Sequence, residues 1–244
     1  MYTMKNNKNN ILIIGHRGAS AIAPPNTLKA FEKAIELKAD YSEFDIHMTK
    51  DGEIVIIHDA DTYSTTGVKG LIKNMTLKQI KNLDAGEGEK IPTLQELIAI
   101  AQKKMGLQIE IKAKNLLDKL VKILNEEKLL ETSIISSFMF DELQKLKNIE
   151  FNAKVGLLLY AELVRPTIIK RKIEKVAKNN FYSIHTYFSH TNRDIVDFAH
   201  NLGLKVIVWT VNDRRIMEEL IHIGVDGIIT DDISLANDVV GRKI

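Results

Sequence analysis

The feature of this sequence that most constrains its fold is a repeated alternation between short β-branched runs and longer amphipathic stretches. Such an alternation is typical of βαβ units and of a parallel sheet. Eight such units follow one another, with strands expected at Ile11–Ile14, Tyr41–Met48, Leu107–Ile111, Ser133–Ser136, Ala153–Leu159, Tyr182–Ile184, Lys205–Trp209 and Gly227–Ile229. Open doubly wound sheets usually contain fewer strands, so the sequence predicts an α/β protein with a closed (β/α)8 TIM barrel.

Helices are expected after each strand, and two of them have clear starting signals. Asn26 or Thr27 can cap the first helix, and Thr93 with Glu96 forms a capping-box pattern before a later one. The expected helical ranges are 27–38, 93–103, 116–125, 140–146, 166–177, 192–202, 216–221 and 233–240.

Residues 59–92 interrupt this alternation. Thr, Gly and Asp clusters surround one short amphipathic stretch, Thr76–Leu83, and the segment ends at Ile91-Pro92. Before it, Glu53–Ile57 is expected to form a hairpin-like extension of the second strand. The 244 residues suit one barrel, since such barrels commonly contain about 250 residues. We therefore interpret residues 1–244 as a single domain, with 59–92 as an inserted excursion.

Composition limits the chemistry that the chain can perform. Because the sequence has no cysteine, any metal must be held by oxygen or imidazole ligands. The net charge of +2 gives no strong field toward nucleic acid or membranes. Residues 1–10 are polar, and the apolar run after them is too short for a signal peptide or a membrane span. We expect a polar tail and a cytoplasmic protein without stable membrane insertion.

Three carboxylates are predicted to meet at the ends of strands, where barrel enzymes have their active sites. Glu43 and Asp45 are two residues apart, so in a strand they point to the same face, and Glu110 is on the next barrel strand. Inward carboxylates are costly unless they are paired or bind a cation, and no ring of arginines matches them. The pattern indicates a hard divalent ion, Mg²⁺ or Ca²⁺.

Other polar residues at strand ends complete this candidate site. His16 follows the first strand and His58 ends the hairpin extension, which suits an acid–base pair because imidazole titrates near neutral pH. Arg17 and Lys112 can supply positive charge for an anionic substrate. Trp209, at the end of a strong strand, is a candidate substrate contact as well as a candidate core residue.

The remaining histidines and the last acidic pair are expected to have ordinary structural roles. The histidines without charged company are interpreted as surface or packing residues, whereas the sixth strand leads to His185. Asp231 and Asp232 are expected to cap the last helix rather than join the site. The residues set aside in this way are His47, His190, His200 and His222.

Taken in order, the motifs resemble the glycerophosphodiester phosphodiesterase family, whose members are metal-dependent (β/α)8 barrels. Each short motif is weak alone, but their order and spacing together are specific, and they run nearly from end to end. They are Gly15-His16-Arg17-Gly18-Ala19-Ser20, Glu43-Phe44-Asp45, Thr49-Lys50-Asp51-Gly52, His58-Asp59, Glu110-Ile111-Lys112, Trp209-Thr210-Val211-Asn212 and Gly224-Val225-Asp226-Gly227-Ile228-Ile229-Thr230-Asp231.

The resemblance implies hydrolysis of small-molecule glycerophosphodiesters, such as glycerophosphocholine or glycerophosphoethanolamine, to glycerol 3-phosphate and an alcohol. By position, it assigns the metal to the three carboxylates, general base and acid to the two histidines, and phosphate binding to Arg17 and Lys112. The excursion at 59–92 resembles the family's inserted subdomain, which covers the glycerol end of the pocket. A homodimer is compatible with a barrel enzyme, although no segment identifies an interface.

One position departs from the family pattern, and two alternative functions stay open. Pro25 occupies the position where the family typically has a glutamate, so a carboxylate near the site is missing. One alternative is therefore a catalytically weak barrel that binds phosphodiesters. The other is a lysophospholipase D, which would need an apolar patch at the mouth of the site. Leu71-Ile72, Met75, Leu157–Tyr160 and Phe188 are candidates, although they also suit core or cap packing.

Overall fold

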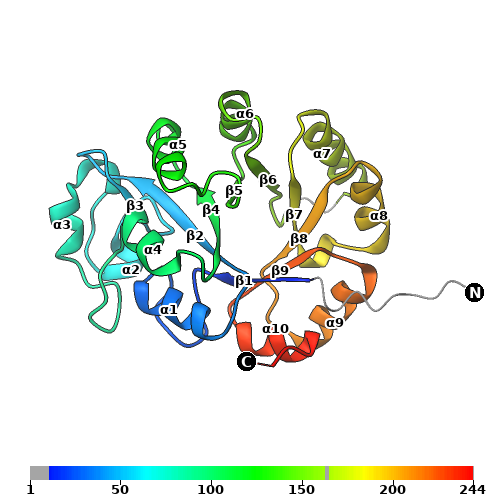
Figure 1. The fold of residues 1–244 in the computed structure, drawn as a ribbon, viewed down its shortest axis with the longest axis horizontal. Coiled ribbons are helices and arrows are strands. Elements are labelled where there is room, and N and C mark those ends of the chain that lie inside the picture. Colours follow the sequence, from blue (N-terminus) through cyan, green and yellow to red (C-terminus); the bar gives the residue numbers. More distant parts are fainter. Residues whose placement is uncertain (1–10, 163–164, 244) are drawn as a thin grey trace, which may run out of the picture.

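The computed structural model describes residues 11–162 and 165–243, and Figure 1 shows a ring of strands surrounded by helices. The tail expected at residues 1–10 lies outside the described residues. Eight strands run parallel: β1 (Leu12–His16), β2 (Tyr41–Met48), β4 (Gly106–Ile111), β5 (Ile134–Ser137), β6 (Lys154–Leu158), β7 (Ser183–Tyr187), β8 (Lys205–Trp209) and β9 (Gly227–Thr230).

Pairing between the first and last strands closes the sheet into a barrel. The order is β1-β9-β8-β7-β6-β5-β4-β2, and β1 also pairs with β2 through Ile14↔Tyr41 and His16↔Glu43. The short strand β3 (Ile54–Ile56) runs antiparallel to β2, as expected for the hairpin extension. The predicted (β/α)8 TIM barrel is therefore confirmed.

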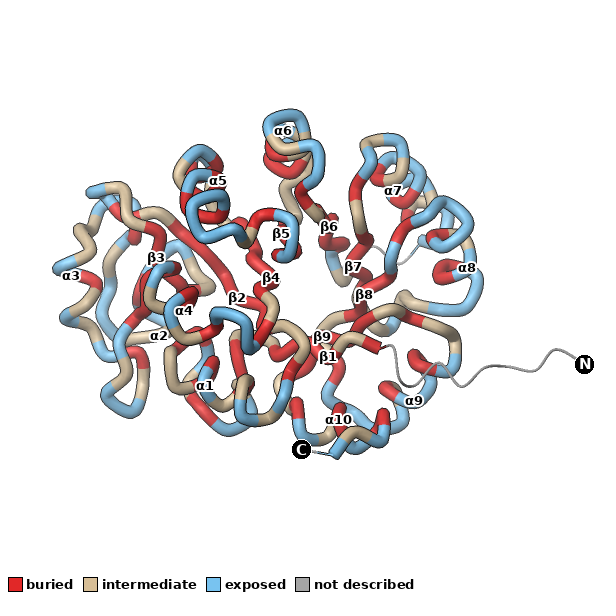
Figure 2. Tube along the Cα trace, viewed as in Figure 1, coloured by how far each residue is buried: buried red, intermediate tan, exposed pale blue. Residues whose placement is uncertain are grey.

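Helices cover the outside of the barrel with their apolar faces toward the strands (Figure 2). Thr27 caps α1 by accepting a hydrogen bond from the backbone N–H of Ala30, and Thr93 and Glu96 form a reciprocal capping box at α4. The helices are α1 (Leu28–Glu36), α4 (Leu94–Ala101), α5 (Leu117–Glu126), α6 (Phe140–Ile149), α7 (Pro166–Lys178), α8 (Arg193–Asn201), α9 (Arg214–Ile223) and α10 (Ile233–Val240).

Several elements differ by a few residues from their expected bounds, and two of these differences have a clear physical cause. Strand β7 begins at Ser183 and continues to Tyr187, so His185 lies inside the strand and not in the loop after it. The full length of this strand was not predicted, because its buried polar residues Ser183 and His185 interrupt the apolar run expected of a barrel strand. Helix α9 begins at Arg214, because Asp213 caps its first backbone N–H groups.

The excursion at 59–92 forms a small layer beside β3. It contains α2 (Tyr63–Thr66), the 3₁₀ turn η2 (Ile72–Asn74) and α3 (Leu77–Lys81). Its buried side chains join those of β3 in a cluster of their own, made of Val55, Ile57, Ile72, Ile80, Ala85 and Ile91. Among the described residues, no helix combines the length and apolar character needed to cross a membrane.

The inside of the barrel is apolar at one level and polar above it. Four isoleucines, Ile14, Ile134, Ile207 and Ile229, form a buried cluster inside the strands. The larger core lies between the strands and the surrounding helices. Polar side chains therefore gather toward the carboxyl ends of the strands, where the loops to the helices begin.

Candidate active site

A pocket of about 240 Å³ lies at the carboxyl ends of the strands. It contains seven of the eight predicted site residues, namely His16, Arg17, Glu43, His58, Glu110, Lys112 and Trp209. The eighth, Asp45, is buried against Arg17 and Lys112. A larger hollow of about 780 Å³ lies around the amino ends of β2, β4 and β5 and contains none of these side chains. The chemistry is therefore concentrated in the smaller pocket.

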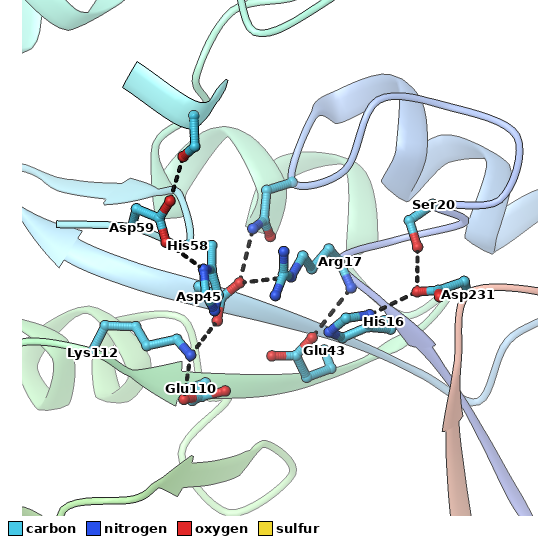
Figure 3. Close-up of polar contacts among 12 residues, drawn as sticks. His16, Arg17, Ser20, Glu43, Asp45, His58, Asp59, Glu110, Lys112 and Asp231 are labelled. Carbon is cyan, nitrogen blue, oxygen red and sulfur yellow. Dashed lines mark hydrogen bonds and ion pairs between the residues drawn. The ribbon is translucent and has the colours of Figure 1, made fainter. Parts of the chain in front are cut away.

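Three buried carboxylates form the centre of the site, as Figure 3 shows. One oxygen from each of Glu43, Asp45 and Glu110 lies within 4.8 Å of the other two. The register explains this convergence, because Asp45 and Glu110 are direct partners on β2 and β4. Such an all-oxygen set suits a hard cation such as Mg²⁺ or Ca²⁺.

Two cationic side chains are paired with these carboxylates. Lys112 Nζ lies 3.1 Å from Asp45 Oδ1 and 2.6 Å from Glu110 Oε1, and Arg17 Nε lies 3.3 Å from Asp45 Oδ2. One arginine and one lysine, rather than a ring of arginines, therefore pair with the acidic cluster. The N–H groups of Arg17 and Lys112 that Asp45 and Glu110 do not engage are the ones that could face a phosphate.

Charge remains unbalanced in this cluster. Burial, followed by repulsion from Asp45 and Glu110, raises the pKa of Glu43 well above its ordinary value. Burial and the negative charge of Asp45 likewise raise the pKa of Glu110 to about 7. Burial also opposes ionisation of Asp45, but Lys112 and Arg17 outweigh it and lower that pKa. A divalent cation would relieve the repulsion that raises the first two values.

His16 is held by a carboxylate from the far end of the chain. Its Nδ1 lies 2.7 Å from Asp231 Oδ1, which also accepts a hydrogen bond from Ser20 Oγ at 2.8 Å. Burial opposes ionisation of Asp231, but its hydrogen bonds from His16, Ser20 and Asn212 lower its pKa to about 2. A permanently ionised Asp231 requires Nδ1–H on His16, which leaves Nε2 as the free proton acceptor. The assignment of Asp231 to helix capping was wrong, because it orients His16, whereas Asp232 does cap α10.

His58 has an equivalent arrangement on the other side of the carboxylates. Its Nδ1 lies 2.7 Å from Asp59 Oδ1, and the hydroxyl of Ser64 donates to the other oxygen of that carboxylate. Burial is the main cause that lowers the pKa of His58, so its neutral form is favoured near neutral pH. His47, buried on β2, donates from Nε2 to the backbone carbonyl of His58 at 3.1 Å and fixes this segment.

The loop after β1 brings a further polar side chain onto Asp45. Arg17 and Asn26 have left-handed φ angles of 56° and 59°, and Asn26 Nδ2 donates to Asp45 Oδ2 at 2.9 Å. A Cβ on Gly18 would lie 2.6 Å from Ala30, so the loop can pack onto α1 only with glycine there. Pro25 is exposed and lines a neighbouring groove with His16, Arg17 and Asp231.

Aromatic rings form one wall of the pocket. Trp209 is half-buried and donates from its indole N–H to the backbone carbonyl of His185 at 3.3 Å. Its ring meets Phe138 and Tyr187 edge to face, with centroids 5.6 Å and 5.4 Å away. Tyr160 stacks on Phe138 at 4.5 Å and is exposed. Trp209 therefore serves both expected roles, in packing and at the pocket surface.

Comparison with known proteins accounts for this combination of fold and side chains. The family model described as "Glycerophosphoryl diester phosphodiesterase family" matches residues 16–235. A glycerophosphodiester phosphodiesterase of Caldanaerobacter subterraneus subsp. tengcongensis is 40% identical over 234 residues, covering 91% of this chain and 94% of its own. One from Bacillus subtilis is 31% identical, covering 91% of this chain and 83% of its own.

Solved structures give the same result. The glycerophosphodiester phosphodiesterase of Thermotoga maritima has a TM-score of 0.81 and 32% identity, covering 94% of this chain and 98% of that one. A phosphodiesterase of Oleispira antarctica, solved with the product sn-glycerol 3-phosphate, has a TM-score of 0.86 and 26% identity, covering 97% and 99%. The chain therefore belongs to the glycerophosphoryl diester phosphodiesterase family.

Proposed function

We propose that this phosphodiesterase hydrolyses glycerophosphodiesters, such as glycerophosphocholine and glycerophosphoethanolamine, to glycerol 3-phosphate and an alcohol. The observation that carries the proposal is a pair of histidines, each oriented by its own aspartate, beside three buried carboxylates. Such a pair can accept a proton from the attacking hydroxyl and donate one to the leaving alcohol. The product seen with the Oleispira antarctica relative supports the same substrate class.

Charge supports an anionic diester as substrate. Three carboxylates with Arg17 and Lys112 sum to −3 + 2, or −1, which would repel a phosphodiester. Mg²⁺ or Ca²⁺ held by Glu43, Asp45 and Glu110 changes the sum to +1, which matches the single negative charge of the diester. When bound, the ion supplies Lewis-acid stabilisation of negative charge on the phosphoryl oxygens.

The side chains of this protein supply proton transfer, phosphate binding and orientation of the two imidazoles. His16, whose Nε2 has no partner among the described residues, acts as general base. His58 acts as general acid from its imidazolium form, which burial disfavours and the hydrogen bond to Asp59 stabilises. Arg17 and Lys112 hold Asp45 in place and direct their remaining N–H groups to the phosphate. Asp231 and Asp59 fix the ring orientations, so that proton transfer requires no rearrangement of either imidazole.

The proposal is tested by measuring glycerol 3-phosphate release from both diesters with Mg²⁺, with Ca²⁺ and with chelator. His16→Ala should lower the rate by about 10²–10⁴-fold, as expected for loss of a general base. His222→Ala is the matched control, because that exposed residue lies on α9 away from the pocket. Equal rates with metal and with chelator would contradict the proposal.

The two alternative activities are outcomes of the same assay. Of the apolar residues considered for a lysolipid groove, Leu71 and Tyr160 are exposed and Leu158 lines the active-site pocket. Ile72, Leu157 and Leu159 are buried in the core. Release from lysophosphatidylcholine but not from the deacylated diesters would favour a lysophospholipase D. Tight binding of the diesters without release would favour a catalytically weak barrel.

A further inference from the structure

A buried polar cluster inside the barrel has no role in the chemistry described above. Gln108 on β4 and His185 and Ser183 on β7 are all fully buried, below the level of the carboxylates. Ser183 Oγ lies 2.9 Å from His185 Nε2, and Gln108 Nε2 lies 3.5 Å from His185 Nδ1. Gly156 makes the space for this ring, because a Cβ there would lie 2.4 Å from Nε2.

The protonation state of the imidazole fixes the direction of these hydrogen bonds. Burial lowers the pKa of His185 to about 3, so the ring is neutral and has one donor and one acceptor nitrogen. The amide nitrogen of Gln108 can only donate, so Nδ1 accepts and Nε2–H donates to Ser183. The amide of Gln108 is thereby oriented with its Oε1 on the side away from His185.

That oxygen has no donor in the part of the chain that the structure describes. Gln108 Oε1 is buried and unpartnered, although Gln108 lines the active-site pocket. Its nearest neighbours by register and face are Glu43, opposite on β2, and Glu110, two residues along β4. When they hold a cation, both are ionised and can only accept, and Ser136 Oγ on β5 is also without a partner and so does not supply the bond. Because Gln108 lines the pocket, a molecule bound there can supply the missing donor.

We propose that Gln108 is a specificity-determining residue whose Oε1 accepts a hydrogen bond from a free hydroxyl of the substrate's glycerol. This inference rests on the proposed function. It adds that the glycerol end of the substrate contacts Gln108. A buried acceptor discriminates strongly, because a ligand without the matching hydroxyl leaves it unpaired. Ligands without a glycerol hydroxyl should therefore bind more weakly than glycerol 3-phosphate.

The test compares binding of sn-glycerol 3-phosphate with binding of ethyl phosphate, which keeps the phosphate but has no glycerol hydroxyl. Calorimetric Kd values are measured with Mg²⁺ present for the wild type and for Gln108→Met, which removes the acceptor at nearly constant volume. We expect the wild type to prefer glycerol 3-phosphate. In Gln108→Met, the Kd for glycerol 3-phosphate should rise by about tenfold or more, and the Kd for ethyl phosphate should stay within about twofold of the wild-type value.

Two further variants separate specificity from folding. Gln144→Met is the matched control, because Gln144 contacts Asn179 outside the barrel and should change neither Kd. Gln108→Asn keeps the amide but withdraws it by one methylene, so it should also lose the preference for glycerol 3-phosphate. It replaces Gln108→Met in the test if that variant does not fold. If Gln108→Met weakens the binding of both ligands equally, Gln108 has only a structural role, and this result would overturn the proposal.

Two other results are also decisive. A wild type without preference between the two ligands, or a Gln108→Met variant that keeps the preference, would overturn the assignment of Oε1 to a glycerol hydroxyl. Failure of the proposed function gives a different pattern, in which the wild type binds glycerol 3-phosphate selectively but releases none from any diester. The binding and turnover measurements therefore distinguish the two failures.

Discussion

Replacing Asp231 by asparagine tests how the site prepares His16 for catalysis. In the native chain, the carboxylate accepts a hydrogen bond from Nδ1 at 2.7 Å and keeps Nε2 free to accept a proton. An asparagine can present its amide N–H₂ to Nδ1, which moves the ring proton to Nε2 and removes the base. That N–H₂ group would take the position of Oδ1, where the hydroxyl of Ser20 can turn to accept from it, and the amide oxygen would keep the hydrogen bond from Asn212, so the local fold should persist.

The size of the effect follows from the role of this proton. Loss of general-base catalysis typically costs about 10²–10⁴-fold, and we expect kcat for Asp231→Asn to fall within that range. KM should change little, since Asp231 orients the base rather than holding the substrate. Kinetics on glycerophosphocholine with saturating Mg²⁺ measure both quantities.

The barrel also supplies a matched control. His200 Nε2 and Asp226 Oδ2 form a similar pair at 2.8 Å, but neither residue lines the active-site pocket. Asp226→Asn should lower thermal stability, because that carboxylate also pairs with Lys205, and leave kcat unchanged. Wild-type kcat in Asp231→Asn, or an equal loss of kcat in both variants, would refute the argument.

Three further predictions concern stability and the support of the site. The pKa of Glu110 rises from 4.5 to about 7 and that of Glu43 also rises, so these two groups bind more protons in the metal-free fold than in the unfolded chain between these values. Their contribution to stability falls as pH rises through this range, whereas buried histidines such as His185, whose pKa is lowered to about 3, contribute in the opposite sense. The test is therefore the stabilisation by Mg²⁺ in calorimetry, which should be larger at pH 8 than at pH 5; the opposite trend would contradict the raised values. Asn26→Ala removes the hydrogen bond to Asp45 and should weaken metal binding, measured by titration, and should lower Tm because alanine is strained at the left-handed φ of this position; unchanged affinity would exclude this support. Gly156→Ala places a methyl group against the buried imidazole and should cost about 1–3 kcal/mol in denaturant unfolding, whereas wild-type stability would show that the ring is free to move.

Much of the architecture could be predicted because it depends on local periodicity. Apolar runs and amphipathic stretches located the strands and most of the helices, and parallel strands in a barrel bring their carboxyl ends together. Residues two apart on β2 and β4 therefore converged as expected, without any knowledge of the loops. Strand β7 was the element least visible, because Ser183 and His185 put polar groups inside the barrel.

The parts of the site that the sequence did not predict depend on contacts with no local signal. His16 and Asp231 are 215 positions apart, and only closure of the barrel between β1 and β9 makes them neighbours. Asn26 reaches Asp45 through a left-handed backbone conformation that its position as a helix cap did not indicate. Gln108 looked like an ordinary strand residue, because its unpartnered oxygen depends on how His185 orients the amide.

The most direct test of the account is a titration of the metal-free protein with Mg²⁺ or Ca²⁺ while glycerol 3-phosphate release from glycerophosphocholine is followed. If three buried carboxylates hold the ion that makes the site active, release should rise with occupancy of a single site. Glu43→Gln should then shift the curve to much higher metal concentration. Release that needs no metal, or a curve that this substitution leaves in place, would contradict the central claim.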